Sequence, residues 1–511
     1  MGNDLRHRPD HLMHITFLKV KWRLTVQAMA ISRACAVWFH PTQQIRRTEK
    51  RSVHPDIGRA GTGCVSTISP KFACSISFHY WGAIMQTSTP SYLVCVPMVD
   101  EPQPNTHTWP ATSHISPTPL GIVCMGHSTP ALWISANTTW YVFNFRARLI
   151  RTLLEQGFTV TVVAPADDYV QRVEALGAKH IDLPMAGGAN PIRDAWLIVR
   201  FWQLLGRHRP AILLSFTPKP NIYGALSARL RGIPVVANIA GLGQAFANEN
   251  WLRHMIKWLY RLALRRAHVF FQNLEDQAQF VAEHLVEQDR TERLPGSGVD
   301  TEHFSPRAGR SIPGREKGLP TEEPFTFLMV GRLLRDKGVG EYVEAARQLR
   351  ADTDNVLFHL LGFIDTRHRG GVTHDDIRSW ERDGIIDYLG HSDDVRSHYA
   401  QANCVVLPSY YREGVPRTLL EAASMGLPVI TTDMAGCRDA VEDGVTGLLV
   451  RPRDVDDLVS KMRQMVHMTD DARQRMGSQG RGRMCRDFSE KLVIQRYVDA
   501  VRRLGVISNV A

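Results

Sequence analysis

Apolar residues change their spacing near residue 131, and this change separates the first quarter of the chain from the rest. From there on, short apolar runs alternate with amphipathic segments, a pattern typical of βαβ units and a parallel sheet. The first runs, which we expect to be strands, are 132–135, 159–164, 212–216, 235–239 and 269–271. Segments 143–155 and 221–229 between them are expected to be helices.

A second set of apolar runs begins after a stretch rich in Pro, Gly and Arg, 305–324, which we interpret as a linker. Its members, again expected to be strands, are 325–330, 356–361, 387–389, 404–407, 429–432 and 447–450. At 511 residues the chain exceeds what one hydrophobic core usually serves. The pattern therefore predicts an α/β protein with two Rossmann-like, doubly wound domains facing a central cleft, where open parallel sheets bind ligands.

Residues 1–128 have no sustained periodicity and few acidic residues, and His, Cys, Ser, Thr and Pro are mixed throughout. Several Arg and Lys residues near the start are faintly typical of a transit peptide, but no clear apolar signal-peptide core accompanies them. The interpretation we favour is a largely irregular, disordered extension or sequence upstream of a misassigned start.

Composition narrows the class of protein only in part. Apolar residues make up 44% and charged residues 22%, the ordinary globular range, and no window reaches the roughly eighteen uncharged apolar residues of a membrane-spanning helix. The net charge of +10 favours anionic partners such as nucleotide phosphates, lipid headgroups or nucleic acid, without choosing among them. Cys404, Cys437 and Cys485 are scattered through the periodic part, as expected for reduced thiols in a cytoplasmic enzyme.

Two carboxylates that follow the run 404–407 carry the strongest chemical signal. The order strand, loop, helix places Glu413 in the loop and Glu421 on the helix, because Pro416 is suited to a first helical turn. Both carboxylates would then lie near the carboxyl end of the strand and face the cleft. A helical carboxylate there can accept hydrogen bonds from the cis hydroxyls of a ribose, and one in the loop can hold sugar hydroxyls. The alternative, for the spacing alone, is a pair of solvated acids.

The spacing Glu413-x7-Glu421, with Pro428 and Val429 after it, resembles the signature of the family-4 retaining glycosyltransferases, which have the GT-B fold. Further segments occur in the order of that family. They are Gly296-Ser-Gly-Val-Asp300 followed by Phe304, Val330-Gly-Arg-Leu-Leu-Arg-Asp-Lys-Gly338, and Gly436-Cys-Arg-Asp439 followed by Asp443, Gly444 and Gly447. The resemblance covers roughly residues 131–505 and leaves the first quarter unmatched.

The resemblance implies roles for the residues that match the family's motifs. Arg332 and Lys337, which flank the start of the helix after 325–330, would stabilise the departing nucleotide diphosphate, for which fixed cations and a helix N-terminus are suited. Glu421 would hold the ribose, and Glu413 would position the donor sugar for a transfer with retention. Without the nearby carboxylates, the two cations would more simply be surface residues at a helix start.

Other donor contacts are expected at strand ends and in loops of the second domain. They are Gly331, Gly362, Asp394, Val395, Gly414, Val415 and Pro416. No Asp-x-Asp motif stands convincingly at a strand end, so we expect neither a metal ion nor another cofactor.

The first domain is expected to hold the acceptor. Its candidate residues follow apolar runs and are Asn137, Thr138, Lys219, Gly241 and Gly243, with Lys219 the leading cation. Pro218 stands where some relatives carry a His, so we do not expect His-assisted activation of the acceptor. This departure from the family pattern indicates a subgroup similar to the transferases of bacterial capsule and O-antigen assembly.

Segment 251–266 combines basic and aromatic residues at helical spacing. Its members Arg253, Lys257, Arg261 and Arg265 recur every fourth residue, and Trp251 and Trp258 belong to the same segment. Such a helix can lie on an anionic membrane surface, or it can pack normally with a solvated basic side, and the sequence supports both interpretations equally.

Together these features predict an enzyme that transfers a hexose or N-acetylhexosamine, with UDP as the expected nucleotide, to a glycan or a polyprenyl-diphosphate-linked sugar. We expect it in the cytoplasm, at most peripheral on the inner face of the membrane, with no nucleic-acid partner. The alternatives are an epimerase of the same fold and a non-catalytic membrane-binding relative. A dinucleotide oxidoreductase is disfavoured, because no G-x-G-x-x-G follows the first run and 241–243 come too late to serve as one.

The expected layout has five parts. They are an extension over 1–128, an acceptor domain over 129–305, a linker over 306–324, a nucleotide-sugar domain over 325–487 and, as the family implies, a helix within 488–511 that crosses back to the acceptor domain.

Overall fold

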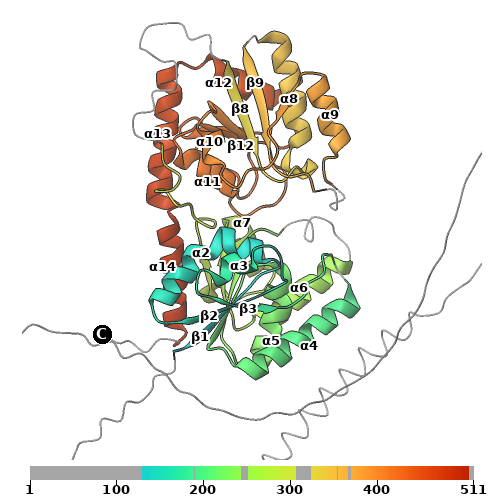
Figure 1. Ribbon diagram of the computed structural model, residues 1–511, viewed down its shortest axis with the longest axis vertical. Helices are drawn as coiled ribbons and strands as arrows, with labels where there is room; N and C mark the ends of the chain where they lie inside the picture. Colours follow the sequence, from blue (N-terminus) through green and yellow to red (C-terminus); the bar gives the residue numbers. More distant parts are fainter. Residues whose placement is uncertain are drawn as a thin grey trace, which may run out of the picture. The chain divides into compact units, whose positions relative to one another are not determined.

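The computed structural model describes residues 129–188, 190–242, 251–306, 324–353, 355–365 and 370–505. The expected extension over 1–128, most of the expected linker and Gly243 lie outside these residues. The described chain forms two separate parallel sheets, each covered by helices (Figure 1). The predicted class, an α/β protein with two Rossmann-like domains, is confirmed.

The first sheet has seven parallel strands in the order β3-β2-β1-β4-β5-β6-β7. They are β1 (Ala131–Ser135), β2 (Thr159–Ala164), β3 (Lys179–Asp182), β4 (Ile212–Ser215), β5 (Val235–Ile239), β6 (His268–Phe271) and β7 (Thr291–Arg293). β1 pairs with both β2 and β4, so the order of the strands reverses there. Doubly wound sheets bind ligands beyond the strand carboxyl ends at such a point.

Helices bury both faces of the first sheet. They are α2 (Thr139–Glu155), α3 (Val170–Glu174), α4 (Pro191–His208), a π-helix (Pro220–Gly224), α5 (Ala225–Leu230), α6 (Trp251–Leu264) and α7 (Leu274–Ala282). Ile134 and Leu214 pack on one face with residues of α2, whereas Trp133 and Leu213 pack on the other with residues of α4, α5 and α6. Because neighbouring residues of a strand point to opposite faces, nearly continuous apolar runs are needed to fill both cores.

The second sheet has six parallel strands in the order β10-β9-β8-β11-β12-β13. They are β8 (Phe325–Val330), β9 (Val356–Leu361), β10 (Asp387–Tyr388), β11 (Cys404–Leu407), β12 (Val429–Thr432) and β13 (Gly447–Val450). Its helices are α8 (Val339–Asp352), α9 (His374–Arg382), α10 (Arg396–Tyr399), α11 (Arg417–Ser424), α12 (Val455–His467) and α13 (Asp470–Asp487), and a 3₁₀ turn, η4 (Arg335–Lys337), precedes α8. The strand order reverses between β8 and β11, as it does between β1 and β4.

The last helix, α14 (Glu490–Arg503), packs on the first sheet although it follows the second (Figure 1). Val493, Tyr497 and Val501 are buried in the same core cluster as Ile134 and Leu214. Ser489 caps the helix by accepting a hydrogen bond from the Lys491 amide. The first domain therefore completes its core with residues from the far end of the chain.

Several elements differ from the sequence-based expectations for local reasons. β3 and β7 were missed because they are polar strands with little buried surface, and they form the two edges of the sheet. The helix expected from 143 begins at Thr139, because the Thr138 hydroxyl accepts a hydrogen bond from the Tyr141 amide at 3.0 Å. Within the described residues, no helix is both long and apolar enough to cross a membrane.

Candidate functional site

The loops that follow β8 and β11 meet at the reversal point of the second sheet. Gly331 and Arg332 follow β8, and the loop 408–416 follows β11. The backbone amides of Tyr410 and Tyr411 both donate to the carbonyl oxygen of Asp336 at 3.1 Å, which ties this loop to η4. The two segments singled out from the sequence therefore lie side by side.

This connection brings Lys337 and Glu413 together. The Lys337 ammonium forms an ion pair with Oε2 of Glu413, and the Ser409 hydroxyl donates to Oε1 at 2.7 Å. Both charged side chains are largely buried, with 15% of Lys337 and 12% of Glu413 exposed. A carboxylate and an ammonium are thus held in fixed positions at the place where this sheet type binds ligands.

Arg332 is not a member of the Lys337–Glu413 ion pair. It is exposed, and no ion-pair partner for it exists in the part of the chain that the structure describes. The nearby Gly331 and Gly362 end β8 and β9 in close contact, since a Cβ on Gly362 would lie far inside contact distance of the Gly331 carbonyl oxygen. The guanidinium of Arg332 is free to bind an anion at the end of β8.

Glu421 lies on α11, as expected, and its carboxylate is held by two neighbouring side chains. The residue is 8% exposed; Nε of Arg417 donates to its Oε1 at 2.8 Å, and the Tyr399 hydroxyl donates to its Oε2 at 3.3 Å. Arg417 also donates to the backbone carbonyl of Asn144 in α2. Burial raises the pKa of Glu421, and the ion pair with Arg417 opposes that rise. The Tyr399 hydroxyl comes from α10, so this contact could not be placed from the local sequence.

The other expected donor contacts lie at helix starts and in loops of the second domain. Asp394 binds Arg396 at 2.6 Å, and this hydrogen bond is the main reason why the pKa of Asp394 falls to about 2. Val395 stands at the N-cap of α10. Pro416 is the N-cap of α11 rather than part of its first turn, because the helix begins at Arg417. Gly414 and Val415 lie in the loop between Glu413 and that cap.

The candidate acceptor residues are distributed over three loops of the first domain. Asn137 and Thr138 follow β1, where Thr138 caps α2. Lys219 precedes the π-helix and forms an ion pair with Oδ1 of Asp194 at 2.5 Å, so its charge is neutralised and only 17% of its side chain is exposed. Gly241 has φ +96 and packs against the backbone of 412–414. Gly243 lies outside the described residues.

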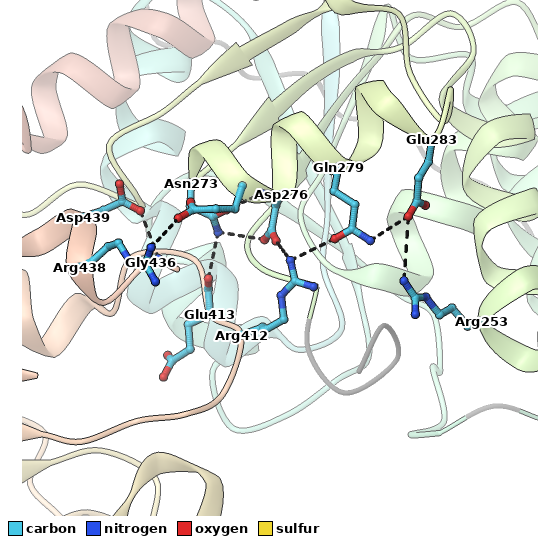
Figure 2. Close-up of polar contacts among 11 residues, drawn as sticks. Arg253, Asn273, Asp276, Gln279, Glu283, Arg412, Glu413, Gly436, Arg438 and Asp439 are labelled. Carbon is cyan, nitrogen blue, oxygen red and sulfur yellow. Dashed lines mark hydrogen bonds and ion pairs between the residues drawn. The ribbon is translucent and has the colours of Figure 1, made fainter. Parts of the chain in front are cut away.

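A polar network that the sequence did not reveal joins the start of α7 to the Glu413 loop. Arg412 binds Asp276 at 2.8 Å, and Nδ2 of Asn273 donates to the Glu413 carbonyl oxygen at 3.1 Å (Figure 2). The pattern Asn273-x2-Asp276 is a helix-start signal in the sequence, but it contains nothing about a partner elsewhere in the chain. Among the described residues, no group of three or more His, Cys, Asp or Glu side chains is arranged to hold a metal ion.

Comparison with known families identifies both halves of the described chain. The family "Glycosyl transferases group 1" matches residues 313–483, and "Glycosyltransferase Family 4" matches residues 144–303. One similar protein is the N,N'-diacetylbacillosaminyl-diphospho-undecaprenol alpha-1,3-N-acetylgalactosaminyltransferase of Campylobacter jejuni. It is 27% identical over 378 residues, which cover 72% of this chain and 97% of that protein.

Two further comparisons agree with this one. The UDP-Gal:alpha-D-GlcNAc-diphosphoundecaprenol alpha-1,3-galactosyltransferase of Escherichia coli is 27% identical over 289 residues, which cover 55% of this chain and 72% of that protein. The crystal structure of HepE from Anabaena in complex with UDP superposes with a TM-score of 0.59 at 16% identity, covering 73% of this chain and 100% of HepE. At that identity the superposition supports the fold alone.

Proposed function

The chain belongs to the family-4 glycosyltransferases of the GT-B fold, and on that premise we propose a donor, an acceptor and a mechanism. The donor is a UDP-hexose or UDP-N-acetylhexosamine. The acceptor is a glycan or a sugar carried on a polyprenyl diphosphate, used in cell-surface polysaccharide synthesis. Transfer occurs with retention of the anomeric configuration and without a metal ion, in the cytoplasm and at the inner face of the membrane.

The Lys337–Glu413 pair at the reversal point of the second sheet is the observation that carries this proposal. Cleavage of a glycosyl–phosphate bond leaves negative charge on the departing diphosphate. Lys337 and Arg332, near the start of α8, stabilise that charge, and they act more strongly in the transition state than in the ground state. Glu413 accepts hydrogen bonds from hydroxyls of the donor sugar, and Glu421 binds the ribose.

The names of the relatives support the choice of substrates. The C. jejuni and E. coli relatives are both named for acceptors on a diphosphate-linked undecaprenol, and the E. coli name specifies UDP-galactose. The HepE structure contains UDP. A lipid diphosphate would also suit a chain with a net charge of +10.

A transfer assay with the full chain tests the proposal. Radiolabelled UDP- and GDP-sugars are offered with undecaprenyl-diphosphate-linked sugars, with and without a chelator, and the linkage in the product is assigned by NMR. We expect a labelled lipid-linked product that requires the acceptor, has the anomeric configuration of the donor and forms equally well with the chelator. Conversion of the nucleotide sugar without any acceptor would instead indicate the epimerase, and no turnover with any sugar would contradict the proposal.

The raised pKa of Glu421 predicts a pH-dependent affinity for the nucleotide. The carboxylate must be ionised to accept hydrogen bonds from both ribose hydroxyls, and burial raises its pKa, so it is protonated at a higher pH than a solvated carboxyl group. We expect the affinity for UDP to fall as the pH is lowered through this pKa, by up to about tenfold per pH unit below it. Calorimetric titration of wild type and of Glu421→Gln from pH 5 to 7.5, roughly the range above an ordinary carboxyl pKa, separates this effect from protonation of UDP itself. Parallel profiles for the two proteins would contradict it.

We also propose that α6 contacts an anionic membrane surface. Trp251 and Trp258 are 75% and 59% exposed. The basic stripe is smaller than the sequence implied, because Glu283 of α7 pairs with Lys257 at 2.8 Å and with Arg253 at 4.0 Å. Arg261 and Arg265 are exposed and have no acidic partner among the described residues, and with Trp258 they line a cavity of about 780 Å³. Exposed indoles beside unpaired cations fit the headgroup region of an anionic bilayer.

Replacing Trp251 and Trp258 together with serine is expected to weaken binding to vesicles that contain phosphatidylglycerol by about tenfold or more, because two indoles leave the interface. Vesicle flotation measures the effect. Leu492→Ser removes an exposed apolar residue, 44% exposed, from α14 and serves as the control. Equal flotation of wild type and the double variant would show that α6 is an ordinary packed helix.

A further inference from the structure

The start of α7 is in direct contact with the segment that carries Glu413. Asn273 is the N-cap of α7, and its Oδ1 accepts a hydrogen bond from the Asp276 amide at 2.7 Å. Nδ2 of the same side chain donates to Oδ2 of Asp276 at 2.9 Å and to the Glu413 carbonyl oxygen at 3.1 Å (Figure 2). One asparagine therefore closes a helix of the first domain and holds the backbone of the Glu413 loop in the second.

Arg412 reinforces this contact from the other side. Its Nη2 donates to Oδ1 of Asp276 at 2.8 Å and to Oε1 of Gln279 at 3.1 Å. Asp276 is 1% exposed, so its carboxylate has almost no water to solvate it, and Arg412 is its counter-charge. A buried carboxylate strongly favours the conformation in which its cation is present, because an unpaired buried charge is destabilising.

The backbone of 412–414 is also fitted to the first domain. The Gly414 amide donates to the Ala240 carbonyl oxygen at 3.1 Å. A Cβ on Gly241 would lie 2.6 Å from the Glu413 carbonyl carbon and 2.8 Å from the Arg412 carbonyl oxygen. The peptide of Glu413 is therefore fixed by the first domain, whereas its carboxylate is fixed by Lys337 and Ser409 of the second.

We propose that Asp276 and Asn273 are positioning residues for glycosyl transfer, and that they act through Arg412 and the Glu413 backbone. They hold the segment 412–414 so that the Glu413 carboxylate stays beside Lys337. The donor site is then complete only when α7 of the first domain contacts the loop after β11. This inference rests on the proposed role of Glu413 at the donor sugar.

A second ion pair between α7 and the second domain, formed by the 3₁₀ turn after β12, provides a matched control. Glu275, the neighbour of Asp276 on α7, binds Arg438 at 3.3 Å. Both side chains are 42% exposed, and this pair has no hydrogen bond to the segment 412–414. Breaking either ion pair would weaken the contact between the domains in general. Only substitutions of Asp276, Asn273 or Arg412 would release the Glu413 backbone from its position.

The test compares Asp276→Asn, Arg412→Gln, Arg412→Lys and Glu275→Gln in the full chain. For each variant, kcat and KM are measured with the UDP-sugar that supports turnover, and UDP affinity is measured by calorimetry. We expect Asp276→Asn and Arg412→Gln to lower kcat by about tenfold or more, the scale of a misplaced catalytic group, with UDP affinity within about twofold of wild type. Arg412→Lys should recover part of the loss, and Glu275→Gln should leave both quantities within about twofold of wild type.

Arg412 lies in a loop with 29% of its side chain exposed, so Arg412→Gln provides a folded variant even if Asp276→Asn unfolds. Normal kcat in Arg412→Gln, or an equal loss in Glu275→Gln, would overturn the inference. A failure of the proposed function can be distinguished from a failure of this inference. If the proposed function were wrong, Glu413→Gln and Lys337→Ala would also turn over at near-normal rates.

Discussion

Replacing Lys337 with alanine is expected to lower kcat by about a hundred- to a thousandfold, the scale of losing one fixed charge partner of a transition state. Two effects combine. The variant lacks a cation where the leaving diphosphate is proposed to bind, and it leaves the Glu413 carboxylate, 12% exposed, without its counter-charge and with the hydrogen bond from Ser409. Steady-state kinetics with the transferred UDP-sugar measure the loss.

Arg335→Ala is the control for this prediction. Arg335 belongs to the same 3₁₀ turn as Lys337, but its side chain is 59% exposed and pairs with Asp376 on α9 at 3.3 Å. We expect its kcat to stay within about twofold of wild type, as for other exposed ion pairs. A near-normal rate for Lys337→Ala, or equal losses in both variants, would remove the basis for assigning the donor site to this loop.

Gly338→Ala is expected to destabilise the second domain by roughly 2–5 kcal/mol, the sum of left-handed backbone strain and overpacking. Gly338 has φ +82, and a Cβ there would lie 2.2 Å from the Pro408 carbonyl oxygen and 2.6 Å from its carbonyl carbon. Both are backbone atoms of the loop after β11, so no side-chain rotation relieves the contact. The melting temperature should fall by several degrees, at about 2–4 °C per kcal/mol.

The matched control for this variant lies two residues further along. Gly340 is in α8, and a Cβ there would have no neighbour within 4 Å. Gly340→Ala should leave stability unchanged or raise it by up to about 1 kcal/mol, because alanine is the better helix former. Scanning calorimetry measures the melting temperatures of both variants. Equal melting temperatures for the two would contradict the close fit of η4 to the β11 loop.

The parts of the site that were predictable are those that follow strand ends. Arg332 and Lys337 come after β8, and Glu413 comes after β11. Because adjacent parallel strands place their carboxyl ends together, the apolar runs alone indicated that these residues share one edge of the sheet. The Lys337–Glu413 pair is the direct result of that topology.

The unpredicted parts depend on side chains that meet from distant positions in the sequence. Glu421 was expected on the helix after the β11 loop, but the sequence did not show that Tyr399 on a different helix binds its carboxylate. Lys219 was expected to be the leading cation of the acceptor site, yet Asp194 on α4 forms an ion pair with it. The pair Arg412–Asp276 joins residues 136 positions apart, each of which is unremarkable in its own segment. Periodicity defines faces and edges, but it does not specify which polar groups pair across them.

The position of α14 has a consequence for biosynthesis. The ribosome releases every strand of the first sheet before it has made the helix that covers Ile134 and Leu214 with Val493 and Tyr497. Until translation passes residue 503, α2 packs on this face of the first sheet, but the part of the core that α14 supplies is missing. The first domain can therefore complete its native core only after the second domain has been synthesised.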